Sequence, residues 1–76
     1  MIYVIYEDRE TGEVLGTKHH TTTVPGSRDT LIDLGDGRGE RRVSWSRWQY
    51  DERKWPESLQ GMDRVHCEAV VTIDLI

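Results

Sequence analysis

The chain has 76 residues, of which 36% are hydrophobic and 32% charged, and its formal net charge at neutral pH is −4. A chain of this length forms a single domain, residues 1–76, and buries only about 60% of the surface that its unfolded form exposes. So small a domain leaves little scaffold for a concave substrate pocket, which counts against an enzyme. The acidic balance counts against a general nucleic-acid binder, because phosphate contacts dominate such binding.

The chain has one cysteine, Cys67, so it cannot form an internal disulfide. Secreted domains of this size usually need such a bond, and we therefore expect a cytoplasmic protein. The apolar residues 1–6 lack a basic leader and a cleavage site, which predicts a strand and not a signal peptide. Because no apolar run is long enough to span a bilayer, we expect no membrane association.

Four strands are predicted in the first two thirds of the chain. Ile, Val and Tyr dominate residues 2–7, and β-branched residues continue through 13–23, so these segments should form a hairpin around Gly12. Residues 31–34 make a short third strand. An Asp-Gly step follows it, which is typical of a tight turn, and the fourth strand covers 41–50.

The last quarter of the chain predicts one irregular connection and one strand. Residues 51–63 are charged and irregular, except for one short helical turn near 56–60 that begins at a proline and ends at a glycine. Residues 64–76 alternate and predict a fifth strand, whose core face holds Val65, Cys67, Ala69, Val71, Ile73 and Leu75.

These elements predict an all-β fold. The preferred form is a small five-stranded SH3-like barrel or a strongly bent antiparallel sheet that hides its edges, and an oligonucleotide-binding barrel is the alternative. Val70 and Ile76 fall on the nominally outer face of the last strand. That placement indicates either burial on both faces or a dimer interface, so both a monomer and a homodimer stay open.

The most unusual segment is residues 38–54. It holds six basic side chains against three acidic ones, a net charge of +3, which leaves −7 for the rest of the chain. It also contains Trp45, Trp48 and Tyr50. Since Trp45 and Trp48 are three positions apart, they cannot share one face of a regular strand. We expect Trp45 in the core, and either an exposed Trp48 or a bulge near 46–47 that resets the phase.

This segment makes a non-catalytic protein-interaction module the leading hypothesis, because Trp, Tyr and Arg are enriched at binding hot spots. The alternative is a single-stranded nucleic-acid-binding barrel that uses residues 38–55. In a third hypothesis the acidic remainder, with Asp33, Asp36 and Glu68, mimics a nucleic-acid backbone. The structural alternative is that the arginines simply pair with carboxylates. The predicted partner-binding residues are Arg42, Arg47, Trp48, Tyr50, Arg53 and Trp55.

No catalytic site, metal site or cofactor is predicted. His19-His20 and His66-Cys67 are zinc-ligand types, but adjacent residues on a strand point to opposite faces, which leaves two ligands where a structural zinc needs four. The same argument separates Cys67 from His66 as a nucleophile and base. The glycine-rich residues 35–39 lack the lysine and helix of a phosphate-binding loop.

A pattern of turn and core residues occupies the middle of the chain. A Val-Pro step precedes a spaced Asp, an apolar strand, an Asp-Gly turn, and a strand with a Trp before acidic residues. The residues of this pattern are Val24-Pro25, Asp29, Leu31, Leu34, Asp36-Gly37, Val43, Trp45 and Asp51. In this pattern the chain resembles very small phage and prophage proteins with an SH3-like barrel. The resemblance implies that fold, and it implies an accessory protein or an inhibitor of host machinery, such as an anti-CRISPR protein.

Overall fold

The computed structural model describes residues 1–20, 27–60 and 67–76. Within these ranges the chain forms five strands and two 3-10 turns. They are β1 (Ile2–Asp8), β2 (Val14–His20), β3 (Leu31–Asp33), β4 (Glu40–Gln49), η1 (Glu52–Lys54), η2 (Glu57–Leu59) and β5 (Ala69–Leu75).

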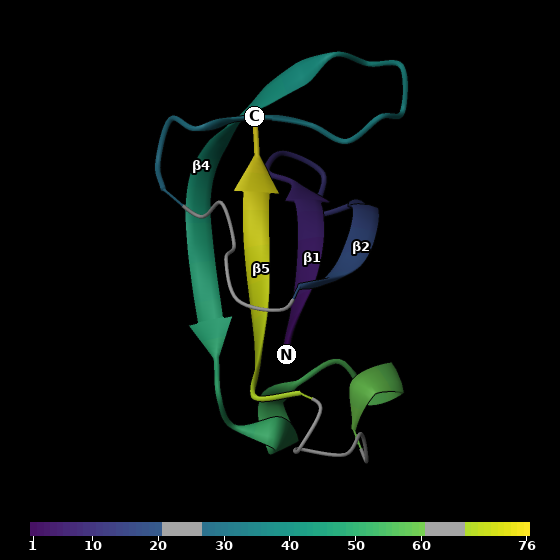
Figure 1. The fold of residues 1–76 in the computed structure, drawn as a ribbon, viewed down its shortest axis with the longest axis vertical. Coiled ribbons are helices and arrows are strands. Elements are labelled where there is room, and N and C mark those ends of the chain that lie inside the picture. The colour runs from purple at the N-terminus through teal and green to yellow at the C-terminus, as the bar shows by residue number, and fades with distance from the viewer. Residues whose placement is uncertain (21–26, 61–66) are drawn as a thin grey trace.

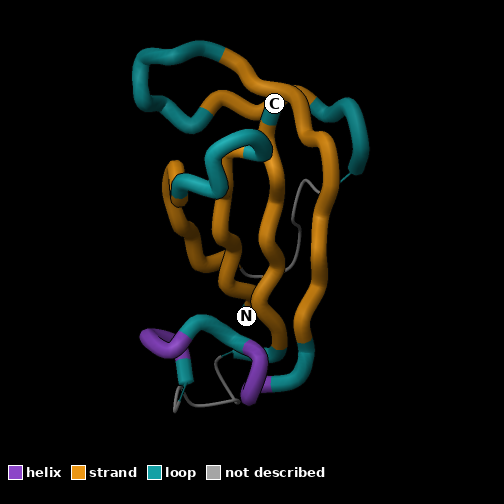
Figure 2. The backbone as a smooth tube through the Cα atoms, turned by 180° about the vertical axis from the view of Figure 1, so that it is seen from behind, coloured by secondary structure: helices purple, strands orange, loops and turns teal. Residues whose placement is uncertain are grey.

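The strands form one sheet in the order β2-β1-β5-β4-β3 (Figure 1). Three of its four pairings are antiparallel, and the central pair, β1 with β5, is parallel. The sheet curls into a half-barrel, with η1 and η2 beneath its lower end (Figure 2). The all-β, five-stranded, strongly bent sheet is therefore confirmed, whereas the expectation of a purely antiparallel sheet is corrected by the parallel pairing of β1 with β5.

The predicted boundaries agree with the observed ones wherever local signals are strong. The hairpin of β1 and β2, the short β3, the long β4 and the helical turn near 56–60 are all present. The fifth strand begins at Ala69 and not at 64. The predicted extensions through 21–23 and 64–66 lie outside the described residues, as does the Val24-Pro25 step.

The turn from β1 to β2 depends on one aspartate and one glycine. The Asp8 carboxylate accepts backbone N–H groups of Glu10 and Thr11 at 2.8 and 3.0 Å. Gly12 has a φ of 73° and donates its N–H to the Asp8 carbonyl oxygen at 2.8 Å. A residue with a Cβ is strained in this left-handed conformation, which is why the turn uses glycine.

The first hydrophobic cluster fills one face of the sheet. Ile2, Leu15, Ile32 and Leu34 pack around its margin and are partly buried. Its buried members come from the three central strands β1, β5 and β4. They are Val4, Tyr6, Val43, Val71, Ile73 and Leu75.

A second hydrophobic cluster covers the lower half of the opposite face. It joins Ile5 of β1 and Val70 of β5 to Trp55, Leu59 and Cys67, which come from the connection below the sheet. Trp55 is only 3% exposed, and its indole Nε1 donates to the Gln49 carbonyl oxygen at 2.9 Å. The connection after β4 is therefore anchored by burial and not left as an irregular loop.

Cys67 lies in this second cluster, although we expected it on the same face as Val71 and Ile73. The expectation is wrong because the strand does not extend back to Cys67: the chain bends at Glu68 before β5 begins. The Glu68 N–H donates to the Met1 carbonyl oxygen at 2.9 Å, which fixes the chain at the start of the strand.

A β-bulge in β4 determines where its aromatic side chains point. Val43 pairs with Leu75 and Trp45 with Asp74, so the register slips between Val43 and Trp45. The slip turns Trp45 away from the face of Val43, and its side chain is 60% exposed, which makes the prediction of a core Trp45 wrong. Trp48 is 42% exposed. The strand therefore has both features that were predicted as alternatives, an exposed Trp48 and a bulge, but the bulge lies between Val43 and Trp45 and not near 46–47.

The contrast between the buried Trp55 and the exposed Trp45 gives a direct test of this fold. Trp55→Ala should lower the free energy of unfolding by about 3–5 kcal/mol, because it leaves a cavity and removes buried apolar area. Trp45→Ala should change it by less than about 0.5 kcal/mol. Urea denaturation measures both, and equal losses from the two variants would contradict the assignment of the second cluster.

Candidate functional site

Two stacked aromatic rings lie at the lower end of β4, Trp48 within the strand and Tyr50 directly after it. Trp48 and Tyr50 lie two positions apart on the same face, with ring centroids 6.2 Å apart and an interplanar angle of 19°. They are 42% and 62% exposed. Trp48 pairs with Val71 of the central strand, so the aromatic pair stands on a backbone that is hydrogen-bonded within the sheet. This arrangement offers a rigid, half-exposed aromatic surface.

Two of the other predicted partner-binding residues lie elsewhere. Arg47 points to the opposite face of β4, where its Nη2 donates to Glu7 at 2.9 Å and to Asp74 at 3.3 Å. Trp55 is buried in the second cluster, and a surface role for it is incompatible with that burial. We therefore leave Trp55 out of the candidate surface.

The remaining two predicted residues are exposed arginines in ion pairs of their own. Arg42 lies where β3 pairs with β4, and its Nε is 3.5 Å from an Asp29 carboxylate oxygen. Arg53 contacts Asp51 through Nε and Nη2, each at 3.1 Å. These side-chain hydrogen bonds lower the pKa of Asp51 and raise the pKa of Arg53. The structure thus brings together Trp48 and Tyr50, but not all six residues.

The arginines of the basic segment are locally compensated by carboxylates. Each of its five arginines lies within 4.0 Å of at least one carboxylate oxygen, as the structural alternative anticipated. Of the six basic side chains only the exposed Lys54 has no such pair among the described residues, so the net charge of +3 does not become a broad unpaired positive surface. This pairing weakens the electrostatic argument for nucleic-acid binding by residues 38–55. The pairs are Arg38–Asp36, Arg41–Asp8, Arg42–Asp29, Arg47–Glu7, Arg47–Asp74 and Arg53–Asp51.

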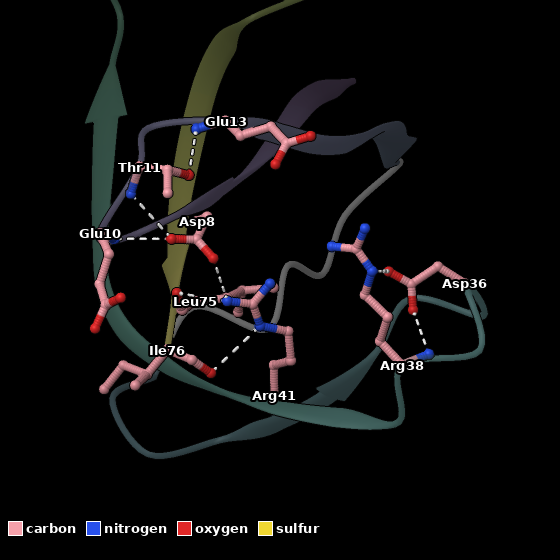
Figure 3. Close-up of polar contacts among 9 residues, drawn as sticks. All are labelled: Asp8, Glu10, Thr11, Glu13, Asp36, Arg38, Arg41, Leu75 and Ile76. Carbon is pink, nitrogen blue, oxygen red and sulfur yellow. Dashed lines mark hydrogen bonds and ion pairs between the residues drawn. The ribbon is translucent and has the colours of Figure 1, made fainter.

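The shortest of these pairs links β4 to the end of β1. Arg41 Nη2 donates to Asp8 Oδ2 at 2.6 Å, and the same guanidinium reaches the carbonyl oxygens of Leu75 and Ile76 at 3.4 and 3.3 Å (Figure 3). The hydrogen bond from Arg41, followed by that from the Thr11 N–H, lowers the pKa of Asp8 to about 2. This contact holds the upper ends of β1, β5 and β4 together.

Two hollows of similar size lie away from the aromatic pair. One, of about 300 Å³, opens between β2 and β3 and includes Tyr6, whose pKa is raised by burial. The other, also about 300 Å³, is lined by Arg9, Arg28, Ser44, Trp45 and Asp74. Sequence reasoning missed the second one because its two arginines come from outside the basic segment. No local sequence signal marks this hollow, because it depends on the exposure of Trp45 and on the bulge beside it.

The described residues contain no group of three or more His, Cys, Asp or Glu side chains placed to hold a metal ion. Of the four zinc-ligand types singled out in the sequence, only Cys67 has a described side chain, since His66 and the side chains of His19 and His20 lie outside the described part. That thiol is buried, with its Sγ 3.6 Å from the Ala69 carbonyl oxygen. Across the same described ranges, no helix is long and apolar enough to cross a membrane.

Searches against family models, curated proteins and solved structures match none of them to this chain.

The Asp8–Arg41 contact predicts how stability depends on pH. Because the folded-state pKa of Asp8 lies below its usual value of 3.8, its contribution is present above about pH 4 and lost as pH falls toward about 2. Asp8→Asn, which keeps an oxygen to accept the turn N–H groups, should be less stable than the original chain at pH 7. The difference should shrink by pH 2.

Thermal unfolding followed at both pH values measures this effect. Asp36→Asn is the matched control, since Asp36 also accepts a turn N–H but lies 4.0 Å from its arginine in an exposed pair. A stability gap for Asp8→Asn that is equally large at pH 2 and pH 7 would show that the carboxylate charge is not what matters.

Proposed function

We propose that this chain is a non-catalytic protein-interaction module whose contact surface is centred on the stacked Trp48–Tyr50 pair. The observation that carries the proposal is the pair itself: two large aromatic rings, both substantially exposed, aligned at the end of a paired strand. Trp and Tyr are the side chains most enriched among residues that dominate binding energy.

The geometry supports this role energetically. Rings that are already stacked lose little conformational freedom on binding, so more of the buried apolar area contributes to affinity. β4 is held on one side by β5 over most of its length, which limits movement of the pair. The surface is therefore pre-ordered for a partner with a complementary apolar pocket.

Charge favours a basic partner. The chain carries a net charge of −4, and the arginines around the pair are already compensated by carboxylates. A negative net charge speeds the approach of a positively charged protein and disfavours the binding of acidic proteins. In line with the resemblance of residues 24–51 to small phage proteins, we propose an accessory or inhibitory role toward a host protein as the specific form of this function.

The partner can be identified by cross-linking in cells. A photoreactive amino acid in place of Tyr50 should trap it, whereas the same amino acid in place of Leu31 should not. Leu31 is a fair control because it is 61% exposed, similar to Tyr50, but lies on β3. Equal trapping from both positions would argue against a localised surface.

The identified partner then allows a quantitative test. Trp48→Ala and Tyr50→Ala should each weaken binding by about thirtyfold, as expected for hot-spot side chains worth about 2 kcal/mol. Trp45→Ala, on the opposite face of the same strand, should leave the affinity unchanged. Calorimetric titration measures the dissociation constants, and circular dichroism checks that each variant is folded. Full affinity of both Trp48→Ala and Tyr50→Ala would overturn the proposal.

A further inference from the structure

Two arginines outside the basic segment, Arg9 and Arg28, differ from the arginines within it. Each arginine of the segment forms an ion pair with a carboxylate. Among the residues that the structure describes, neither Arg9 nor Arg28 lies within 4.0 Å of a carboxylate. Arg9 Nη1 donates to the uncharged Ser44 hydroxyl at 2.6 Å. Both arginines are exposed, so their charges are available to an anion from solution.

The fold brings these two arginines to one hollow. Arg9 directly follows β1, and its N–H donates to the Leu75 carbonyl oxygen at 3.0 Å. Arg28 precedes Asp29, whose N–H donates to the Val43 carbonyl oxygen at 2.9 Å. Leu75 of β5 and Val43 of β4 are paired with each other directly before the bulge, and the hollow of about 300 Å³ is lined by the bulge residues Ser44 and Trp45.

The bulge supplies an aromatic wall. Trp45 lines the hollow with its indole 60% exposed, and the neighbouring Ser44 is 9% exposed, so its hydroxyl lies at the base. An exposed indole beside two guanidinium groups suits a ligand that is both planar and anionic. Guanidinium forks match phosphate oxygens, and an indole face stacks on a nucleobase.

One carboxylate, Asp74, also lines the hollow and must be accounted for. Its Oδ1 accepts from Arg47 Nη2 at 3.3 Å, so its charge is offset by an arginine on the neighbouring strand. Arg47 itself also binds Glu7. Arg9, Arg28 and Arg47 carry three positive charges against the two negative charges of Asp74 and Glu7, so this group of side chains keeps an excess of one positive charge.

We propose that this hollow binds a single nucleotide unit, with the base stacked on Trp45 and the phosphate between Arg9 and Arg28. Its volume is at the lower end of the range for small-ligand pockets, which suits one unit. The acidic character of the chain as a whole would repel a long phosphate backbone. An acidic side chain of a protein would use the guanidinium groups but would leave the indole without a stacking partner.

The test is an NMR titration of the whole chain with adenosine monophosphate, adenosine and inorganic phosphate. Adenosine monophosphate should bind with a dissociation constant below about 1 mM. It should shift the Trp45 indole and the side chains of Arg9 and Arg28. Adenosine and phosphate should each bind at least about tenfold more weakly, since each offers only half of the recognised chemistry.

Matched variants locate the site. Trp45→Ala and Arg28→Gln should each weaken binding of adenosine monophosphate by about tenfold. Trp48→Ala and Arg53→Gln should not, since Trp48 lies on the other face of β4 and Arg53 is paired with Asp51. The variants that test the proposed protein-binding surface are thus controls here, so the two proposals can fail independently.

A short oligoadenylate distinguishes the source of the nucleotide. Tighter binding than adenosine monophosphate, with an affinity that falls as salt rises, would assign the site to a single strand. Equal or weaker binding would assign it to a free nucleotide. No shift of the Trp45 indole, undiminished binding by Trp45→Ala, or displacement of the nucleotide by an equimolar acidic peptide would each overturn the proposal.

Discussion

β5 is the element from which the other strands take their positions. It pairs with β1 along one edge and with β4 along the other, and the residues Ala69, Val70, Val71, Ile73 and Leu75 are each at most 2% exposed. Val70 and Val71 are neighbours on opposite faces, so the strand is packed from both sides. A domain this small gains two apolar clusters from one strand, which offsets the poor ratio of core to surface in a short chain.

The parts of the fold that could be predicted are those with a local sequence signal. Turn chemistry and β-branched runs are local signals, and they placed the β1–β2 hairpin, β3, β4 and the turn at η2 correctly. The apolar Val70 on the outer face of β5 had two explanations, burial on both faces of the strand or a dimer interface. Its exposed fraction of 2% within this one chain confirms burial on both faces. The parallel pairing of Ile2 with Ala69 has no local signal, because it depends on contacts between opposite ends of the chain.

The two errors concerning tryptophan have the same origin. Trp45 is exposed because one bulge shifts the strand's phase, and nothing in the local sequence fixes the position of that bulge. Trp55 is buried because it packs on Ile5 and Val70, and these two residues are brought together by the pairing of β1 with β5. Charge was misleading for a related reason: the basic segment is opposed in space by Glu7 and Asp8 from β1, Asp29 and Asp74, which sequence spacing does not place beside it.

The parallel pair also has a kinetic consequence. β1 with β2 and β3 with β4 are neighbours along the chain and can associate early, since short connections close at little entropic cost. The pairing of β1 with β5 joins residues at opposite ends of the sequence, and both hydrophobic clusters need it. Folding should therefore be limited by the meeting of the two halves and slow for a chain of this size. Until they meet, each half exposes an apolar strand edge that can pair with another molecule.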